Sequence, residues 1–494
     1  MLVALNGILF QSFEWHNSDD GQHYQRLIDM APGLAARGVT AIWLPPAYKA
    51  QGTNDTGYSV YDLYDLGEFD QKGSVRTKYG HRDELLACIK TYQSLGIQVY
   101  MDVVLNHRSG ADESEVVTAE KMDPENRAQA ISDPYEIEAW THFTFPGRGD
   151  QYSPLKLHWY HFTGCDYDAR NDETGVFRFI GENKYWADDV SGEYGNYDYL
   201  MGVDVDLAHP EIREDIFRWV EWFIETTGAD GFRLDAVKHM SSAFVRDLVE
   251  HIRSKYEQFF FVAEYWDADQ RELDEYLDDT DMLLTVFDVA LHFKLHQASI
   301  EGDAYDLRTI FDGTSVLNDP LHTVTFVDNH DSQPGQSLES RVEDWFKAHA
   351  YALILLREAG YPCVFYGDYC GTGDGALPAI GGVLDKLMAL RRIYAKGEQE
   401  EYFAEENCIG WVRFSEDSQT SLAVILSNGA ASKLRMCVGE ANVGAVYADY
   451  LGNLEDKIVV DEEGWAEFPV AERSLSCWLR DNMTLNFWEV SDDA

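Results

Sequence analysis

Four short polar strings, each directly after an apolar run, carry most of the residues in this chain that could do chemistry. They occupy residues 102–107, 231–239, 261–266 and 326–331, and each places carboxylates or imidazoles next to its run. The runs are too short for helices and do not alternate, which is typical of strands buried on both faces of a parallel sheet. Functional side chains in such sheets, and in (β/α)8 barrels, lie at the carboxyl ends of the strands. We therefore expect the four strings to form the walls of one active site.

Three carboxylates in these strings could work together in acid–base chemistry: Asp235, Glu264 and Asp331. Like charges at close range move pKa values apart, so one carboxyl group can keep its proton beside an ionised neighbour. Glycosidic bond cleavage has this requirement, because an acid must protonate the leaving oxygen while an ionised group attacks or supports the cationic sugar. A single Asp or His after a strand is more often a helix cap or turn residue. Four strings in the same relation to their strands favour a shared site.

Eight apolar runs are predicted to be the strands of the barrel that positions these residues. In chain order they cover residues 7–10, 40–44, 99–104, 231–234, 260–263, 285–287, 323–326 and 363–366. Helical patterns lie between them, as in residues 242–256, where Phe244, Leu248 and Ile252 recur at helical spacing.

The spacing of the strands predicts two further domains. The interval between the third and fourth strands is too long for one crossover, which indicates an inserted domain. After about Tyr394 the pattern changes to short strands with turns such as Asn428-Gly429, which is typical of an antiparallel β-sandwich. The predicted fold is α/β: a TIM barrel with an inserted β-rich domain after the third strand and a C-terminal antiparallel β-sandwich domain. The expected divisions are residues 1–105 and 211–393 for the barrel, 106–210 for the inserted domain and 394–494 for the C-terminal domain.

The charge and the hydropathy of the chain argue against several classes of partner. The 494 residues include 87 acidic and 39 basic ones, which gives a formal net charge of −48. Nucleic acids and anionic membranes would be repelled by this charge. No apolar stretch reaches the roughly 20 residues that a transmembrane helix needs. Two explanations of the charge stay open: a surface that keeps the protein soluble, or adaptation to high salt, where counterions screen self-repulsion.

The cysteines and the first residues indicate a reducing compartment. The seven cysteines are odd in number, scattered and without a CxxC pair, so we expect small buried side chains rather than a disulfide framework. The first residues lack the basic segment and the long apolar segment of a signal peptide. We therefore expect a cytoplasmic protein, with a secreted protein that has lost its signal peptide as the alternative.

With these motifs the sequence resembles the α-amylase family of glycoside hydrolases. The four strings look like four hallmark regions of that family, and residues 200–210 resemble a further signature near the end of the inserted domain. Residues 43–49, 57–69 and 360–368 are also similar to family stretches. The resemblance runs from about Asn6 to about Arg480 and is nearest to bacterial liquefying-type and intracellular α-amylases.

The resemblance implies roles for individual residues. Asp235 looks like the nucleophile that forms a covalent glycosyl-enzyme, and Arg233, on the same face of its strand, would keep it ionised. Glu264 looks like the acid/base, and Asp331 like a third carboxylate that grips sugar hydroxyls and favours ring distortion. The expected sugar contacts are a flat face on Tyr58, hydrogen-bond donors on His107 and His330, and Lys238, His239 and Trp266 on the leaving-group side.

The resemblance also implies a structural calcium ion between the barrel and the inserted domain. Asn106, Asp168, Asp198 and Asp204 match its side-chain ligands, and the carbonyl oxygen of His239 would complete the set; hard oxygen ligands suit Ca²⁺. Ala187 and Ala208 stand where similar liquefying amylases carry acidic ligands of additional metal, which argues against a cluster of several ions.

The implied activity is that of a retaining endo-α-amylase, which hydrolyses internal α-1,4-glucosidic bonds of starch, glycogen and maltodextrins by double displacement. One alternative is a maltooligosaccharide-forming amylase or an α-glucan transglycosylase on the same site, because acceptor-side loops decide the outcome. A non-catalytic glucan-binding protein is the alternative from another class. Loss of a catalytic carboxylate would mark it, and all three are present. We expect a monomer whose partner is the α-glucan.

Overall fold

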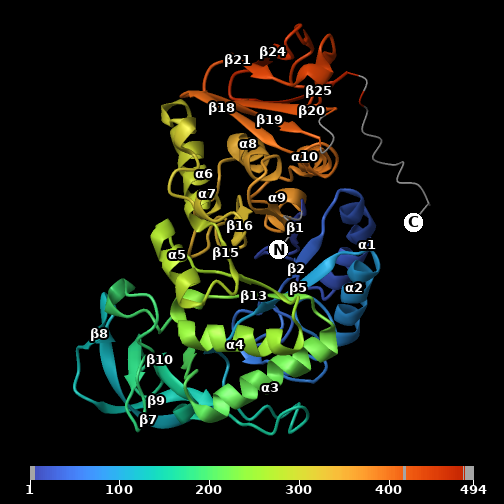
Figure 1. Ribbon diagram of the computed structural model, residues 1–494. Helices are drawn as coiled ribbons and strands as arrows, with labels where there is room; N and C mark the ends of the chain where they lie inside the picture. Colours follow the sequence, from blue (N-terminus) through green and yellow to red (C-terminus); the bar gives the residue numbers. More distant parts are fainter. Residues whose placement is uncertain (1–5, 416–418, 482, 484–494) are drawn as a thin grey trace.

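The computed structural model describes residues 6–415, 419–481 and 483, and its centre is a closed barrel of eight parallel strands (Figure 1). In chain order the strands are β1 (Leu9–Gln11), β2 (Ala41–Leu44), β5 (Gln98–Val103), β13 (Gly231–Leu234), β14 (Phe260–Ala263), β15 (Thr285–Phe287), β16 (Thr323–Phe326) and β17 (Tyr361–Phe365). Each strand pairs with its neighbours in this order, and β17 returns to β1. The predicted fold class is confirmed, and β13 to β16 have the predicted bounds.

Helices connect the barrel strands and cover the outside of the barrel (Figure 1). The longer ones are α1 (His23–Ala36), α2 (Arg82–Ser94), α3 (Pro210–Thr227), α4 (Ser242–Lys255), α5 (Gln270–Asp279), α6 (Val289–Glu301), α8 (Asp344–Leu355) and α10 (Gly381–Ile393). Helix α4 shows why they form: Phe244, Leu248 and Ile252 recur on one buried face, and the Ser241 hydroxyl accepts the Phe244 N–H as an N-cap. Two shorter helices are α7 (Ser315–Asn318), shortly before β16, and α9 (Tyr366–Cys370), directly after β17.

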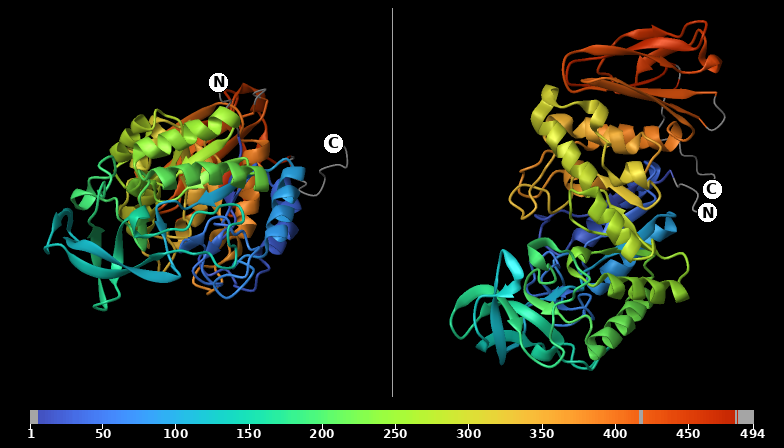
Figure 2. Two further views of the ribbon diagram at one scale, coloured as in Figure 1. Left: turned by 90° about the horizontal axis from the view of Figure 1, so that it is seen from below. Right: turned by 60° about the vertical axis from the view of Figure 1, so that its left-hand side comes forward.

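A second sheet lies between β5 and β13 in the chain and projects from one side of the barrel (Figures 1 and 2). Its strands are β6 (His107–Arg108), β7 (Glu113–Asp123), β8 (Asn126–Ala130), β9 (Tyr135–His142), β10 (Phe162–Asp168), β11 (Glu173–Phe179) and β12 (Val203–Val205). A short ribbon of β3 (Lys49–Ala50) and β4 (Val60–Asp62) follows β2 and carries Tyr58 in its connection.

The last part of the described chain forms two antiparallel sheets at the opposite end of the molecule (Figure 2). The larger sheet has the order β18 (Gln399–Glu405), β19 (Cys408–Phe414), β20 (Ser421–Ser427), β25 (Leu475–Arg480), β22 (Val446–Asp449) and β23 (Lys457–Val459). The smaller sheet pairs β21 (Ser432–Cys437) with β24 (Trp465–Val470). The turn at Asn428-Gly429 therefore passes between the two sheets, and Met436, Phe468 and Trp478 fill the core between them.

The cysteines and the helices agree with two of the expectations from composition. All seven cysteines are free thiols, and five of them are buried. Burial raises the pKa of the Cys363 thiol to about 12, which keeps it protonated and unreactive. Within the described residues, no helix is long and apolar enough to span a membrane.

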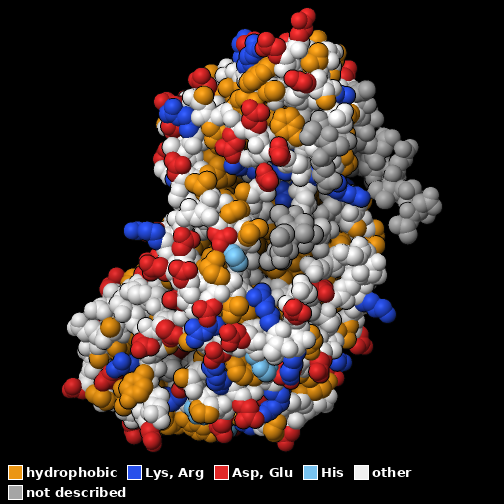
Figure 3. Space-filling view, in the orientation of Figure 1, with side chains coloured by type: hydrophobic (Ala, Val, Ile, Leu, Met, Phe, Trp, Pro, Cys, Tyr) orange, Lys and Arg blue, Asp and Glu red, His pale blue; other side chains and the backbone are white. Residues whose placement is uncertain are grey.

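Acidic side chains are spread over the visible face of the molecule rather than gathered in one patch (Figure 3). We expect activity and melting temperature to hold or rise between low and molar NaCl, because counterions weaken repulsion among the excess carboxylates while the apolar core stays intact. A salt titration that follows both quantities tests this. Loss of activity in moderate salt would contradict the prediction.

Candidate active site

The strand register brings the catalytic candidates together at the carboxyl end of the barrel. Leu234 is paired with Ala263 across β13 and β14, so the next residues in the two strands, Asp235 and Glu264, emerge side by side. Backbone hydrogen bonds continue this pairing: the Asp235 N–H donates to the Val103 carbonyl at 3.0 Å, and the Glu264 N–H donates to the Leu234 carbonyl at 2.9 Å. Both side chains are buried.

Arg233 holds the charges of the site in place from inside the barrel. Its side chain is fully buried, and its Nη1 atom lies 2.7 Å from Asp235 Oδ1 and 3.0 Å from Asp102 Oδ1. Its Nη2 atom forms an ion pair with Glu264 Oε2 at 2.8 Å. One guanidinium thus faces three carboxylates, as expected for a cation that keeps a nucleophilic carboxylate ionised.

Asp102 is a functional residue that the sequence analysis did not assign. Its buried carboxylate accepts the Trp43 indole N–H at 2.9 Å and the Tyr58 hydroxyl at 2.8 Å in addition to Arg233. It therefore orients both the arginine and the aromatic ring of Tyr58. The available signal was a carboxylate within the third barrel strand, where Asp102 is the direct register partner of Arg233.

The pKa values of the three carboxyl groups are raised, chiefly by burial. Burial raises the pKa of Asp235 to about 6 against the opposing effect of Arg233. The pKa of Glu264 is raised by burial and by the neighbouring Asp235, and the two side chains hydrogen-bond each other. Arg233 pairs with both groups, whereas their mutual contact lowers the pKa of Asp235 and raises that of Glu264, which favours the proton on Glu264. The pKa of Asp331 is raised well above its usual range by burial and by Glu264. The arrangement separates an acid from an ionised partner.

Three nearly parallel rings line the site next to the carboxylates. The ring of Tyr58 stacks with that of His330 at 4.9 Å, and the ring of Trp15 lies 6.0 Å from Tyr58 at an angle of 3°. Flat aromatic faces of this kind suit the apolar faces of sugar rings. Trp15 was not predicted, and its only signal was its position shortly after the first strand. The backbone N–H of Trp15 donates to Gln333 Oε1 at 3.1 Å, which ties it to the loop of Asp331.

The two histidines of the site differ in the hydrogen bond that they can offer a sugar. The Gln11 amide donates to His330 Nδ1 at 3.0 Å, so Nε2 carries the proton and can donate, as expected. His107 instead donates through Nε2 to the Tyr58 carbonyl at 2.9 Å. Burial lowers the pKa of His107 to about 4, so its free Nδ1 is an acceptor rather than the predicted donor. Among the described residues, His107 Nδ1 and Glu264 Oε1 are buried without a hydrogen-bond partner, and His330 Nε2 lies 3.3 Å from Asp331 Oδ2.

The residues expected on the leaving-group side lie on the adjoining loops. Lys238 donates to the Trp266 carbonyl at 3.1 Å and pairs with Asp267 at 2.9 Å and with Glu193 at 2.7 Å. Because Glu193 belongs to the inserted segment, this lysine joins the insertion to the barrel beside the site. Trp266 itself is half-buried against aromatic rings of α6 and β16.

Four of the five expected calcium ligands converge where β12 meets the end of β5. The Val205 N–H donates to the Asn106 carbonyl at 2.9 Å, and Asp204 is in register with His107. The carboxyl groups of Asp198 and Asp204 hydrogen-bond each other. His239 is anchored one residue away from Asp198, where its Nδ1 atom donates to the Tyr197 carbonyl at 2.7 Å.

The chemistry of this group fits a hard cation. Asn106 carries a buried side-chain amide nitrogen without a partner among the described residues, so its amide is free to turn its oxygen inward. Burial raises the pKa of Asp198 to about 7, and burial and Asp198 raise that of Asp204 well above its usual range. A calcium ion would relieve both effects and suits oxygen ligands.

The hydrogen bonds of Asp168 do not connect it to this group of calcium ligands. Its carboxylate accepts the backbone N–H groups of Glu138 and Arg170, both at 3.0 Å, and the side-chain amide of Asn171 at 2.6 Å. These three donors make it a turn residue between β10 and β11. Its role as a calcium ligand remains a prediction.

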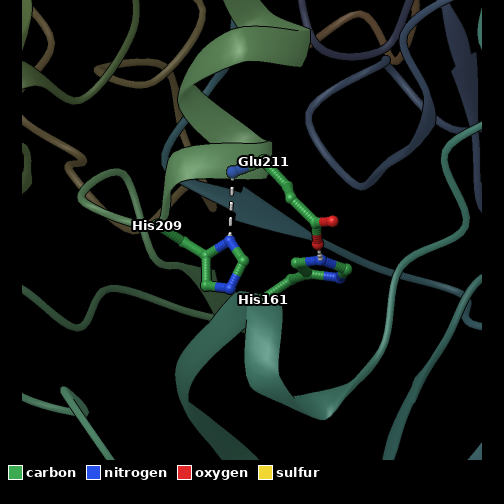
Figure 4. Close-up of side chains that lie close together, drawn as sticks. All are labelled: His161, His209 and Glu211. Atoms are coloured by element: carbon green, nitrogen blue, oxygen red, sulfur yellow. Dashed lines mark hydrogen bonds and ion pairs between the residues drawn. The ribbon is translucent and has the colours of Figure 1, made fainter.

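A second group of possible metal ligands in the described part of the chain consists of His161, His209 and Glu211, at the start of α3 (Figure 4). Its hydrogen bonds favour a helix cap instead. His161 Nδ1 accepts the His158 N–H at 3.0 Å, and His209 Nδ1 accepts the Glu211 N–H at 3.3 Å. Both rings therefore carry their proton on Nε2, and neither has a lone pair left for a metal ion. His161 donates that proton to the Glu211 carboxylate at 3.0 Å.

Comparisons with known proteins identify the family. Residues 8–408 match the family described as alpha amylase, catalytic domain, and residues 422–479 match the alpha-amylase C-terminal family. The chain belongs to the α-amylase family. This confirms the resemblance seen in the sequence and the prediction of an α-amylase.

The similar proteins cover nearly the whole chain. It is 48% identical over 482 residues to an α-amylase of Bacillus licheniformis, which covers 96% of this chain and 94% of that protein. It is 47% identical over 478 residues to a glucan 1,4-alpha-maltohexaosidase of Bacillus sp. (strain 707), covering 96% and 92%. It is 41% identical over 489 residues to a cytoplasmic α-amylase of Escherichia coli (strain K12), covering 96% and 99%. The crystal structure of an Anoxybacillus α-amylase shares the fold, with a TM-score of 0.64, 17% identity and coverage of 98% and 100%.

Proposed function

We propose that this α-amylase is endo-acting and retaining, and that it hydrolyses internal α-1,4-glucosidic bonds of starch, glycogen and maltodextrins. Asp235 is the nucleophile, Glu264 the acid/base and Asp331 the carboxylate that binds hydroxyls of the sugar being cleaved. The proposed domain boundaries lie at residues 105, 210 and 393. The barrel carries the active site, and the inserted domain covers one side of it. The enzyme works as a monomer on its glucan.

The reaction takes two displacements at one carbon. In the first, Glu264 gives its proton to the glycosidic oxygen while Asp235 attacks the anomeric carbon, so the bond to the leaving glucan breaks and a glycosyl ester forms. In the second, Glu264 takes a proton from a water molecule, whose oxygen attacks the anomeric carbon and releases Asp235. Arg233 stabilises Asp235 as a carboxylate before the first step and after the second.

The pairing of Asp235 and Glu264 with one guanidinium is the observation that supports the retaining mechanism: Arg233 Nη1 lies 2.7 Å from Asp235 Oδ1, and Nη2 lies 2.8 Å from Glu264 Oε2. An inverting enzyme needs a water molecule beside its base, which requires carboxyl groups roughly 6.5–9.5 Å apart. Two carboxyl groups held by the two ends of one guanidinium favour the shorter spacing of roughly 5–5.5 Å at which the second carboxylate attacks directly. A cavity of about 660 Å³ beside Tyr58, lined by Trp15, Asn54, Lys78 and Met201 among others, supports endo action because it accommodates further sugars of a long chain.

Proton NMR of the first products tests the mechanism. Hydrolysis of maltoheptaose should release products in the α-configuration, because two inversions at the same carbon restore the starting stereochemistry. The spectrum has to be recorded before mutarotation equalises the anomers. Early products with the β-configuration would overturn the proposed role of Asp235.

Calcium is the proposed metal, held by the side chains of Asn106, Asp198 and Asp204 and the carbonyl oxygen of His239, with Asp168 as a further predicted ligand. When bound, it would fix the segment that leads to Lys238 and His239. Lys184 pairs with the buried Asp206 nearby, so a protein cation already neutralises this carboxylate. This pairing supports a single calcium ion.

Product length and cellular location remain proposals. The similarity to a maltohexaosidase keeps a maltooligosaccharide-forming amylase open as the second candidate, and the bridge of Lys238 to Glu193 and Asp267 is a feature on which acceptor binding could depend. Product analysis on soluble starch separates it from random endo cleavage and from transglycosylation.

The free cysteines and the similarity to a cytoplasmic enzyme support a cytoplasmic location, with secretion as the alternative.

A further inference from the structure

A buried ion-pair network adjoins the loop of His330 and Asp331, outside the groups assigned to the reaction. Lys347 of α8 lies between two carboxylates, with its Nζ atom 3.0 Å from Asp328 Oδ2 and paired with Asp368 Oδ1. All three side chains are buried, with at most 2% of each exposed. The Tyr351 hydroxyl donates to the other oxygen of Asp368 at 2.7 Å.

Asp328 connects this network to the loop itself. The Ser332 hydroxyl donates to Asp328 Oδ1 at 3.1 Å. This bond joins the residue before Asn329 to the residue after Asp331, so that His330 and Asp331 lie between the two bonded ends. The backbone N–H of Val342 donates to the same oxygen at 3.1 Å. Within the loop, Asn329 Oδ1 accepts the N–H of Asp331 at 3.0 Å. The backbone of Asp331 is thus fixed through residues that do not touch the other catalytic carboxylates.

Asp368 connects the same network to the next two strands of the barrel. It lies in α9, directly after β17, and the Phe365 N–H at the end of β17 donates to the Tyr351 hydroxyl at 3.3 Å. Phe365 is in register with Gln11 of β1, whose amide holds His330 Nδ1. Lys347 therefore links the elements that hold His330 and Asp331 from both sides.

A stabilising role does not explain why these charges are buried. Removing three charged groups from water costs free energy that their mutual attraction often does not exceed, and neutral replacements of buried ion networks are frequently as stable. Burial raises the pKa of Asp328 and of Asp368, which shows that the interior opposes their ionised forms. Two carboxylates also outnumber the single lysine. What the network provides is directional contacts between α8, β16 and β17.

We propose that Lys347, through Asp328 and Asp368, is a positioning residue that holds the loop of His330 and Asp331 in its reactive geometry. This inference rests on the role proposed above for Asp331. A displacement of a reacting group by about 1 Å can cost roughly a hundredfold in rate, so a lost tether should appear in kcat.

The first test is a neutral replacement of the network: Lys347→Met combined with Asp328→Asn and Asp368→Asn. It removes the tether to α8 without leaving an unpaired buried charge, and asparagine at 328 can still accept from Val342 and Ser332. We expect kcat on maltoheptaose to fall by about ten- to a hundredfold. KM should stay within about threefold, because the ring platform of Tyr58 and Trp15 is untouched. Wild-type kcat in this variant would overturn the proposal.

Arg391→Met is the matched control for burial. Arg391 is also 1% exposed, but it donates to the carbonyl groups of Gly7 and Leu355, before the first barrel strand and at the end of α8. Its loss should lower the melting temperature and leave kcat within about twofold. If the control lowers kcat as much as the neutral network does, general loosening of the barrel explains both, and the proposal fails.

Ser332→Ala keeps the proposal testable if the neutral network does not fold. This small change breaks the bond to Asp328 at 3.1 Å and the bond from the Asn329 N–H at 3.0 Å, both within the loop, and should lower kcat by about five- to tenfold. In the neutral background it should add little, because residue 328 is then no longer tethered to Lys347 and its bond to Ser332 no longer connects the loop to α8. Wild-type kcat in Ser332→Ala would count against the inference. Asp331→Asn serves as the reference. If this variant stays fully active, the role proposed for Asp331 itself is wrong. If it loses most of its kcat while the neutral network variant keeps wild-type kcat, only the positioning role of Lys347 is overturned.

Discussion

Asp235→Asn should lower kcat by roughly 10⁴-fold or more while the enzyme stays folded, because the amide cannot attack the anomeric carbon. Glu264→Gln should lose a similar factor in kcat on starch, whereas its first displacement with a maltooligosaccharyl fluoride should remain fast and only the second should be slow. Fluoride leaves without a proton, so the first displacement no longer needs Glu264. The covalent glycosyl-enzyme should then accumulate and be visible by intact-mass spectrometry. The two variants together separate the nucleophile from the acid/base.

The control for this experiment is Asp288→Asn. Asp288 directly follows β15, as Asp235 follows β13, and is equally buried, but its carboxylate caps α6 and accepts the N–H groups of Leu291 and Val316. Asparagine keeps an acceptor oxygen for the cap and loses only the second one, which accepts the Val316 N–H, so the change should cost about 1 kcal/mol of stability and leave kcat within about threefold. If Asp235→Asn behaved like Asp288→Asn, the assignment of the nucleophile would be wrong.

The dependence of kcat/KM on pH at acidic pH follows from the pKa of Asp235. Asp235 has to be ionised to attack, and burial raises its pKa to about 6. We therefore expect kcat/KM to fall as the pH drops through about 6, well above the usual range of an aspartate. A pH–rate profile of the wild type checks this. If kcat/KM falls only near pH 4, Arg233 lowers the pKa of Asp235 more than burial raises it.

The barrel was predictable from the sequence because each of its strands is a continuous apolar run with both faces buried. β13 to β16 have the predicted bounds for this reason. The pairing of β21 with β24 was not predictable in the same way, since the Asn428-Gly429 turn gives no sign that the chain crosses to a second sheet. Long-range pairing of short strands depends on packing between the sheets rather than on local pattern.

The catalytic carboxylates could be predicted because they follow their strands directly, whereas the groups that orient them could not. Asp102 acts through an arginine 131 residues further along the chain, and the hydrogen-bond direction of His107 is decided by a carbonyl 49 residues away. Trp15 becomes a platform only because Tyr58 and His330 stand beside it. These relations come from the register and closure of the barrel.

Calcium should stabilise the fold rather than take part in the chemistry. A ligand that binds only the native state adds free energy by mass action, about 2.7 kcal/mol at a hundred times its dissociation constant. A chelator should therefore lower the melting temperature by several degrees. Asp204→Ala should abolish the response to chelator, because it removes a ligand at the centre of the group. Unchanged melting with chelator and no metal in the purified protein would count against the site.

Asp168→Ala is the informative comparison for the ligand set. If Asp168 is only a turn residue, its loss should cost about 1 kcal/mol of stability both with and without calcium. The change in melting temperature caused by chelator should then remain. As a ligand, its loss should shrink that shift in parallel with Asp204→Ala. Titrating calcium against the melting temperature of both variants decides between the two roles.

The calcium effect should also grow with pH, and its sign follows from the buried carboxyl groups. Burial raises the pKa of Asp198 to about 7, so the metal-free fold binds protons more tightly than the unfolded chain does. The contribution of Asp198 to the stability of the metal-free fold is then fully present below about pH 4 and is lost as the pH rises through about 7. Calcium requires ionised carboxylates and removes this penalty when it binds. The difference in melting temperature between calcium-loaded and chelated enzyme should therefore widen from pH 4 to pH 7, and a difference that narrows over this range would show that Asp198 is not a ligand.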